Sequence, residues 1–271
     1  MPSGRSERGE AVDPATEVSR GPNGVKAVER TARVLLGLAA HPEGETLSGL
    51  CRSLGEPLAT LHRTLAALRS YDLVRETADG RFALGSSTAV LAAAFSEGLD
   101  LRQEARPLMG QLRERTTETV HLGVLSGAQI VYIDKLDSPN AVRMVSRVGG
   151  TNPAYSTAIG KCILAHSTHE ELERVAELTG VQFGVRLDLP ALEHEFEQIR
   201  ESGYGTDLGA NEPGICCVGA PIFDISGEAV AGISVTTPEM RFDATRVEDL
   251  GNLIAATAGT ISERMGFVGR Q

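Results

Sequence analysis

The chain has 271 residues, which predicts one small and one medium domain, each able to bury a core. Apolar residues make up 41%, no apolar run approaches the ~18 residues of a membrane helix, and residues 1–5 lack an apolar signal core, so a cytoplasmic protein is expected. The net charge of −10 argues against DNA binding unless the charge is unevenly distributed.

The charge is in fact unevenly distributed. Residues 23–85 hold eight basic and seven acidic residues, a net charge of +1, whereas residues 1–22 carry −1 and the remainder carries −10. The acidic excess therefore falls on the second domain, where it does not meet phosphates. A DNA-binding domain with so small a positive charge offers few phosphate contacts, which predicts that it binds as a dimer.

The N-terminal region predicts an arm and two helices. Residues 1–24 are polar and aperiodic, which is typical of disorder. Apolar residues at helical spacing predict a first helix over 28–39. Thr46 is the expected N-cap of a short second helix over 47–54, Gly55 fits the turn after it, and Pro57 suits the first turn of a third helix.

Residues 54–65 have the pattern of the turn and second helix of a helix-turn-helix. The expected buried face of the third helix carries Leu61, Leu65 and Leu68, and the opposite face carries Ala59, Arg63, Ala66 and Ser70. The exposed face is the one that a DNA major groove would meet. Residues 73–76 and 80–85, with the turn signal Asp79-Gly80, predict a two-stranded wing.

Two further helices are expected next. An Ala-rich apolar run over about 87–97 predicts the first, Gly98 breaks it, and residues 100–116 predict the second, with a kink near Pro107. We interpret this pair as a linker and dimerisation element. The alternative, that both are simply core helices, fits the pattern nearly as well.

From residue 118 the apolar period changes to two. Strands are expected at about 120–124, 130–133, 142–145, 216–223 and 229–236. Helices are expected over 156–166, after a capping box at Thr168, around 192–203, and over 247–261. This order predicts an α+β domain with a central, mainly antiparallel sheet.

Four separate segments, in order, resemble one family. These segments are similar to the IclR-type (isocitrate lyase regulator) bacterial transcriptional regulators. The first contains Gly55, Pro57, Thr60, His62, Arg63 and Leu65, and the others are residues 118–122, 153–161 and 214–221. At Leu58 and Ala59 the chain departs from the family pattern, which usually has a polar residue and a serine. The resemblance covers about residues 25–266.

The resemblance implies a domain organisation and a set of partners. A winged helix-turn-helix would occupy 25–86, a helical linker and dimer element 87–117, and a GAF-like effector-binding domain 118–266. The expected partners are double-stranded DNA with a pseudo-palindromic operator, a small carboxylate or aromatic-acid effector, and further copies in a homodimer that pairs into a tetramer. Neither a cofactor nor a membrane partner is expected.

The candidate DNA contacts lie on the third helix and the wing. Arg63 is the strongest candidate, because a guanidinium bridges guanine O6 and N7. Thr60 and His62 suit either DNA contact or support of the helix, and Arg69 suits a phosphate. For Arg75 and Arg81, phosphate contact is favoured over salt bridges with Glu76 and Asp79. The DNA-binding prediction is thus Thr60, His62, Arg63, Arg69, Arg75 and Arg81.

The candidate effector residues come largely from the resemblance: Ala158, Ile159, Asp207, Cys217, Ser234 and Thr236. Backbone N–H groups near Ala158 and Ile159 would lie at a helix start, which favours a carboxylate. Ser234 and Thr236 share one strand face and offer hydroxyls. Cys217 suits a small wall residue, and Lys161 is expected to bond structural carbonyls rather than the ligand.

The residues that would indicate other classes of function are incomplete. Gly160-Lys161 lacks the first glycine of a phosphate loop, since Tyr155 stands there. A thiol dyad of Cys216 or Cys217 with His194 has nothing in the sequence to bring it together. His166-x-x-His169 lacks further ligands, and the four cysteines include no C-x-x-C pair, so no metal site is expected. A winged helix used only for protein contacts remains the third alternative.

Overall fold

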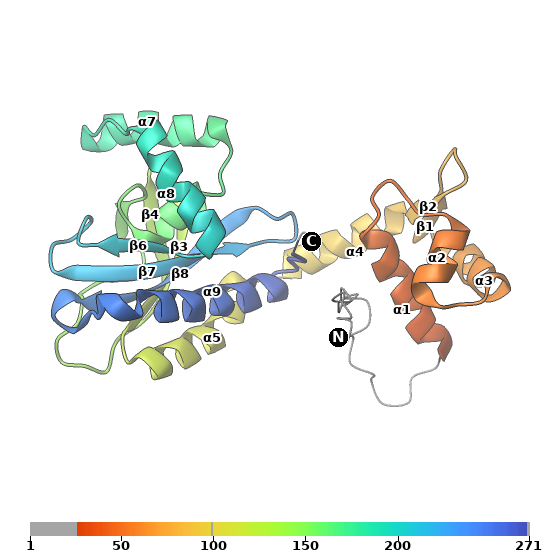
Figure 1. The fold of residues 1–271 in the computed structure, drawn as a ribbon, viewed down its shortest axis with the longest axis horizontal. Helices are drawn as coiled ribbons and strands as arrows, with labels where there is room; N and C mark the ends of the chain where they lie inside the picture. The colour runs from red at the N-terminus through yellow and green to blue at the C-terminus, as the bar shows by residue number, and fades with distance from the viewer. Residues whose placement is uncertain (1–25, 99, 270–271) are drawn as a thin grey trace, which may run out of the picture. The chain divides into compact units, whose positions relative to one another are not determined.

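The computed structural model describes residues 26–98 and 100–269, so the arm expected over residues 1–24 lies outside the described residues. The chain divides into two compact units, Met1–Glu97 and Gly98–Gln271, which we call unit 1 and unit 2 and describe separately (Figure 1). No helix in the described part of the chain is long and apolar enough to cross a membrane.

Unit 1 contains the three expected helices, α1 (Lys26–Ala39), α2 (Leu47–Leu54) and α3 (Leu58–Arg69). Thr46 caps α2, as predicted, by accepting a hydrogen bond from the Gly49 backbone N–H at 3.0 Å. Gly55 ends α2 in the left-handed conformation, with φ of 66°, which a glycine adopts without strain. Leucines from all three helices pack together in one core.

The expected wing follows α3. Strands β1 (Val74–Glu76) and β2 (Phe82–Leu84) pair antiparallel, and Gly80 in the turn has φ of 78°. An isolated bridge between Glu45 and Phe82 ties the wing to the start of α2. The winged helix-turn-helix predicted from the sequence is therefore confirmed.

The two helices expected after the wing are also present. Helix α4 (Ser86–Gly98) ends at the predicted glycine, and α5 (Leu101–Thr116) begins with its N-cap Asp100 and continues through Pro107 as a single helix. In α5, Ala105, Leu108, Met109 and Leu112 are buried in the core of unit 2. Helix α5 therefore contributes one apolar face to the core of unit 2.

Unit 2 is built on a six-stranded sheet in the order β5-β4-β3-β8-β7-β6, with every neighbouring pair antiparallel. The strands are β3 (Thr119–Ser126), β4 (Gln129–Leu136), β5 (Thr151–Pro153), β6 (Gly205–Leu208), β7 (Ile215–Phe223) and β8 (Ala229–Pro238). The predicted α+β class with an antiparallel sheet is confirmed.

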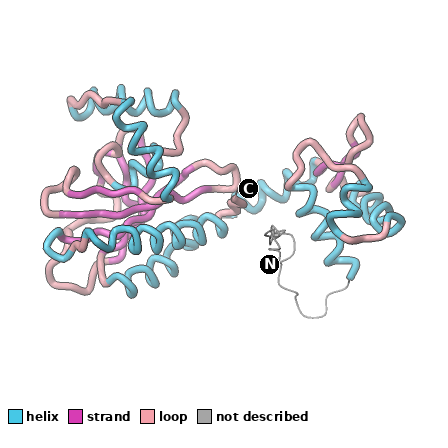
Figure 2. Tube along the Cα trace, in the orientation of Figure 1, coloured by secondary structure: helices cyan, strands magenta, loops and turns pink. Residues whose placement is uncertain are grey.

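Helices cover both faces of this sheet (Figure 2). One face packs against α5 and α9 (Val247–Arg264), and the other against α6 (Ala158–Leu164), α7 (His169–Phe183) and α8 (Leu189–Ser202). The short turns η2 (Glu239–Arg241) and η3 (Ala244–Arg246) connect β8 to α9. Thr168 caps α7 through the Glu171 N–H at 3.2 Å, as the capping-box signal predicted.

The prediction of a strand at 142–145 is wrong. Residues 137–150 form no strand, and Val142 and Val145 are 58% and 94% exposed, so their alternation does not reflect a buried sheet face. The segment is held instead by bonds to its backbone: Lys135 Nζ donates to the Ser146 oxygen at 2.6 Å and Arg241 Nη1 to the Val142 oxygen at 2.9 Å. Strands β5 and β6, at the two edges of the sheet, were missed.

Candidate functional sites

Helix α3 exposes the face that the sequence predicted. Ala59, Arg63, Ala66 and Ser70 are exposed, whereas the three leucines of the opposite face are buried. Two alanines on the exposed face keep the helix slim enough to approach base edges in a major groove. The geometry therefore suits a recognition helix.

Arg63 lies at the edge of a crevice between α1 and α3, with a volume of about 470 Å³. Its Nε donates to the Ala59 carbonyl oxygen of its own helix at 3.3 Å. The guanidinium thus lies back along α3, and it has to turn outward before it can bridge a guanine. His62 beside it is exposed and Thr60 is half-buried.

The basic residues at the end of α3 and in the wing are partly engaged in ion pairs. Arg69 Nη1 lies 2.6 Å from Glu76 Oε2, and Arg81 Nε lies 3.0 Å from Asp79 Oδ2. For Arg81, the less favoured alternative, a salt bridge with Asp79, is thus present. Glu76 pairs with Arg69 rather than with Arg75. Arg75 is exposed on β1.

Two arginines of α1 brace the turn between α2 and α3. Arg30 Nε pairs with Glu56 Oε2 at 2.9 Å, and Arg33 Nη2 donates to the Leu54 carbonyl oxygen at 2.6 Å. Both were counted only as part of the basic charge of unit 1. Their role is to fix α1 against the turn, which reduces the positive charge that is left for DNA.

In unit 2, the sheet places four predicted effector residues on one face. Strand register puts Asp207 of β6 beside Cys217 of β7, and Cys217 beside Thr236 of β8. Ser234 lies two residues before Thr236 and therefore on the same face. This is the face that α6 covers, because the intervening Val218 and Val235 belong to the core beneath α5 and α9. We call these four side chains the polar row.

Helix α6 lies directly on this face because glycines form the floor beneath it. A Cβ atom at Gly219 would lie 3.3 Å from the Ala158 Cβ, and one at Gly232 would lie 2.9 Å from Ile159 Cγ2. A larger residue at either position would push α6 away from the sheet. The glycines thus bring Ala158 and Ile159 next to the polar row, as the sequence predicted.

The acidic member of the row is not a solvated loop residue. Asp207 is 2% exposed within β6, and its Oδ1 accepts from the backbone N–H groups of Ala210 and Asn211 at 2.8 and 3.2 Å. Burial raises the pKa of this carboxyl above its usual value, and the two amide bonds oppose that rise. The carboxyl therefore orders the loop that follows β6 and stays beside the row.

The thiol of Cys217 is a wall group rather than a nucleophile. Its Sγ lies 3.3 Å from Thr236 Oγ1, and burial raises the pKa of the thiol to about 12. A thiol with so high a pKa stays protonated at neutral pH and is a poor nucleophile. His194, the other half of the considered dyad, is exposed on α8 and lies 3.9 Å from Glu197.

His121 is the main site residue that the sequence reasoning missed. It is fully buried on β3, with Nδ1 3.2 Å from Thr236 Oγ1 and Nε2 2.7 Å from Ser146 Oγ. Its ring lies against Tyr132 at a centroid distance of 4.7 Å. The period-two pattern could have indicated it. Val120 and Leu122 lie on the apolar face of the strand, so His121 between them lies on the other face, which is that of the polar row.

Lys161 binds structural groups, as predicted. Its Nζ donates to the Thr206 carbonyl oxygen at 3.1 Å and pairs with Glu195 at 2.8 Å. It therefore links α6 to β6 and α8. No group of three or more His, Cys, Asp or Glu within residues 26–98 and 100–269 is arranged to hold a metal ion.

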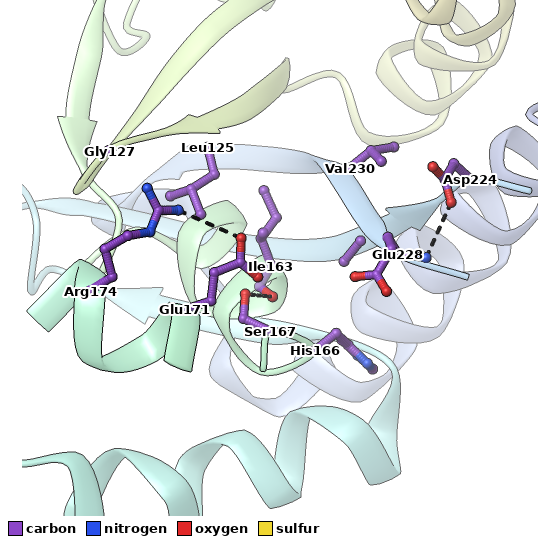
Figure 3. A pocket seen from close by; sticks show the side chains of 11 residues that line it. Leu125, Gly127, Ile163, His166, Ser167, Glu171, Arg174, Asp224, Glu228 and Val230 are labelled. Carbon is purple, nitrogen blue, oxygen red and sulfur yellow. Dashed lines mark hydrogen bonds and ion pairs between the residues drawn. The ribbon is translucent and has the colours of Figure 1, made fainter. Parts of the chain in front are cut away.

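A second cavity, of about 450 Å³, lies at the other end of α6 (Figure 3). It shares no residue with the polar row. Of its charged groups, Arg174 lies 3.6 Å from Glu171, and Asp224 Oδ1 accepts a hydrogen bond from the Glu228 backbone N–H at 3.2 Å. His166 packs edge-on against Phe223. These groups hold turns and helix ends together, so the polar row is the better candidate.

A winged helix-turn-helix with an exposed recognition face, joined to an α+β unit with a buried polar row, is the architecture of a DNA-binding regulator that senses a ligand. The chain matches two family models, the "IclR helix-turn-helix domain" over residues 27–78 and "Bacterial transcriptional regulator IclR C-terminal" over residues 93–263. The chain therefore belongs to the IclR family of bacterial transcriptional regulators.

Individual relatives agree with this assignment. The HTH-type transcriptional regulator KdgR of Escherichia coli is 32% identical, over 93% of this chain and 97% of KdgR, and the repressor AllR of E. coli is 30% identical over 90% and 92%. Among solved structures, the Agrobacterium tumefaciens repressor BlcR is 30% identical, with a TM-score of 0.72 over 92% of this chain and all of that one.

Function follows from the family at a general level. The protein is a DNA-binding transcriptional regulator with a C-terminal effector-binding domain. It is not an enzyme: the relatives named here and the regulator BhcR of Paracoccus denitrificans are transcriptional regulators, and the IclR family is regulatory. The thiol-enzyme alternative therefore has no support among these relatives, and the protonated thiol of Cys217 offers no nucleophile for it.

Proposed function

We propose that the protein binds a pseudo-palindromic operator as a homodimer in the cytoplasm, and that a small organic acid bound at the polar row changes this binding. The observation that carries the proposal is the polar row itself. Asp207, Cys217, Ser234 and Thr236 come from three neighbouring strands and lie on one face next to α6, and all of them except the half-buried Cys217 are buried. Buried polar groups gathered on one face, away from the apolar core, suit a small polar ligand.

For DNA, we propose that Arg63 contacts a base and that Thr60 and His62 support it from the same helix. Arg75 is the wing residue best suited to a phosphate, because it is exposed. Arg69 and Arg81 reach phosphates only by exchanging their partners Glu76 and Asp79. DNA contact is therefore expected to rest more on Arg63 and Arg75 than on the other two arginines.

For the effector, we propose that a carboxylate, or an aromatic acid, lies between the start of α6 and the polar row. Ala158 and Ile159 would provide the wall, and the hydroxyls of Ser234 and Thr236 would orient the acid. Asp207, whose carboxyl is already used by two backbone N–H groups, would mark the far end of the row. Cys217 would limit the size of the ligand.

Dimerisation is proposed through α4. Val90 and Leu91 are 69% and 61% exposed on this helix, an arrangement that a second copy would cover. The proposed organisation is the winged helix over 25–86, the linker and dimer element over 87–117, and the effector domain over 118–266. Pairing of dimers into a tetramer is part of the same proposal.

The test combines a thermal-shift screen of small aliphatic and aromatic acids with operator binding measured by fluorescence anisotropy. A ligand that binds only the folded protein raises its melting temperature, so a binding acid should stabilise the protein and change operator affinity. Ser234→Ala should weaken this acid roughly tenfold, because one ligand hydrogen bond is lost. Operator affinity without the acid should not change.

The matched control is Ser226→Ala, in the exposed turn between β7 and β8. It removes a hydroxyl from the turn that joins the same two strands, away from the polar row. The effector half of the proposal fails if Ser234→Ala and Ser226→Ala respond alike, or if no acid in the screen stabilises the protein. Light scattering that finds only monomers with full operator affinity would refute the dimer half.

A further inference from the structure

The first turn of α3 carries two exposed apolar residues, Leu58 and Ala59, which we call the apolar tip. Leu58 is 57% exposed, whereas the three leucines that this helix buries are at most 5% exposed. Leu58 therefore lies beyond the end of the leucine face that packs in the core of unit 1. More than half of its side chain is left for a contact outside the fold.

The apolar tip lies where a recognition helix meets base edges. In helix-turn-helix proteins the N-terminal residues of the second helix contact the bases. Leu58 is the first residue of α3, and Ala59 begins the exposed face that continues with Arg63. Arg63 Nε donates to the Ala59 carbonyl oxygen at 3.3 Å, so the arginine side chain already extends back toward the tip. The tip and Arg63 are therefore directed at the same part of an operator half-site.

The same turn is open to the DNA backbone. The N-cap of α3 is Pro57, and no side chain among the described residues caps the N–H groups of Leu58 and Ala59. An uncapped helix start favours an anion, and DNA supplies phosphates. The neighbouring acid Glu56 does not oppose this, because its carboxylate pairs with Arg30 at 2.9 Å. A phosphate bound there would hold the tip close to the bases.

An apolar tip selects one group in the major groove. Guanine, adenine and cytosine present only hydrogen-bond donors and acceptors there, whereas thymine also presents a methyl group. Apolar side chains, including that of alanine, contact this methyl group. Against another base, the tip would cover polar atoms without bonding to them, which is unfavourable. The tip therefore favours thymine both by contact with the methyl group and by the cost of the other bases.

The distance along α3 determines where this thymine lies. Arg63 comes five residues after Leu58, which is about 7.5 Å along a helix with a rise of about 1.5 Å per residue. Successive base pairs are about 3.4 Å apart, so side chains with this separation reach bases at most about two base pairs apart. The thymine is therefore expected close to the guanine that Arg63 contacts, once in each half-site.

We propose that the apolar tip of α3 binds the methyl group of an operator thymine within about two base pairs of the base that Arg63 contacts. Leu58 supplies most of the contact because it has the longer side chain, and the small Ala59 leaves room for the methyl group beside the helix. This inference rests on the proposed contact of α3 with DNA. It adds Leu58 to Arg63 as a residue that determines operator specificity, and it names a base that the operator contains.

The first measurement locates the thymine. In vitro selection from a random duplex library, with the full chain, yields a bound sequence whose affinity is measured by fluorescence anisotropy. Each thymine in turn is then replaced by uracil, which pairs in the same way but lacks the methyl group. At one position in each half-site, uracil should weaken binding about fourfold, the value of one buried methyl group. This position should lie beside the guanine whose replacement loses its effect in Arg63→Ala.

The second measurement assigns the methyl contact to Leu58. Leu58→Ala should bind the thymine and uracil duplexes about equally, with an unchanged unfolding transition because the side chain is mostly exposed. The matched control is Leu36→Ala, which shortens a leucine that is 62% exposed on α1 and should keep the wild-type ratio. With cytosine at the same position, a 5-methyl group should strengthen binding by the wild-type protein but not by Leu58→Ala.

The outcomes separate this inference from the proposed function. If no uracil substitution near that guanine weakens binding, or if the loss persists in Leu58→Ala, the inference is overturned although the protein still binds its operator through Arg63. If the uracil effect disappears in Leu58→Ala while Arg63→Ala binds normally, the apolar tip is supported and only the proposed Arg63 contact fails. A full chain that enriches no sequence contradicts the proposed operator and the inference together.

Discussion

The two units use polar residues in opposite ways. In unit 1 the functional candidates, such as Arg63 and Arg75, are exposed, and part of the basic charge is neutralised by ion pairs at the surface. In unit 2 the candidates Asp207, Ser234 and Thr236 are at least 96% buried, and His121 is fully so. A DNA surface works with charges that water already solvates, whereas a ligand site needs neutral groups with fixed hydrogen bonds. Changes in unit 1 should therefore alter affinity with little loss of stability, and changes in unit 2 should alter both.

The largest expected effect comes from the close contact beneath α6. A Cβ atom at Gly160 would collide with the backbone oxygen of Ala154, and a backbone atom cannot move aside cheaply. Gly160→Ala should lower the free energy of unfolding of unit 2 by about 3 kcal/mol or more, the upper end of overpacking. The control is Gly110→Ala in α5, where a Cβ meets nothing within 4 Å, and a helical alanine should stabilise by about 0.5–1 kcal/mol. Urea denaturation followed by circular dichroism measures both, and equal stabilities would contradict the prediction.

Acid should destabilise unit 2 through His121. The folded protein holds the pKa of this histidine at about 4, whereas the unfolded chain has the ordinary value near 6.5. Between these values the unfolded chain binds more protons, so the contribution of His121 is complete above about pH 6.5 and is lost as the pH falls toward 4, by up to about 3 kcal/mol. Denaturation curves at several pH values should show a flatter dependence in His121→Asn. Parallel curves for the two proteins would show that His121 titrates normally.

Operator affinity should depend on Arg63 by about 1–3 kcal/mol, the range for a bidentate contact to guanine. Arg63→Ala should therefore weaken operator binding by one to two orders of magnitude in an anisotropy titration, with an unchanged unfolding transition because the side chain is exposed. Arg63→Lys should not restore the affinity, since an ammonium cannot bridge O6 and N7. Full affinity in the lysine variant would mean that Arg63 contacts a phosphate rather than a guanine.

The smallest effect is expected at the wing. Glu76 occupies Arg69 at a distance of 2.6 Å, and both side chains are between 40% and 50% exposed. Glu76→Gln should free Arg69 for a phosphate, so operator affinity should rise by a factor of about two to five and depend more steeply on salt. Glu43→Gln, an exposed acid outside the wing, is the control. A fall in affinity would mean that Glu76 positions Arg69 for DNA rather than competing with DNA for it.

The sequence predicted best what depends on neighbouring residues. The caps at Thr46 and Thr168, the turn at Gly55 and the leucine face of α3 were all recognisable from local patterns, and each is present in the structure. The family resemblance also named the four residues of the polar row, which the structure places on one face of the sheet. The exposed valines of 137–150 imitated a strand, because alternation alone does not reveal whether a partner strand exists.

What the sequence could not predict depends on contacts between distant residues. His121 and Thr236 are 115 residues apart, and His121 and Ser146 are 25 apart, so no window of sequence contains the network. Strand β6 has only four residues at the edge of the sheet, too few to show a period. The ion pairs of Arg69 and Arg81 depend on rotamers within the wing, which residue types alone leave open.

The glycine floor beneath α6 limits how this regulator could acquire a different ligand. Gly219 and Gly232 leave no room for a side chain between the helix and the sheet, so the spacing of these two layers is effectively constant. A paralogue with the same floor would have to change ligand by substitutions along the polar row or at its ends. Engineering of a new inducer specificity should therefore leave these two glycines alone and randomise Cys217, Ser234, Thr236 and His121.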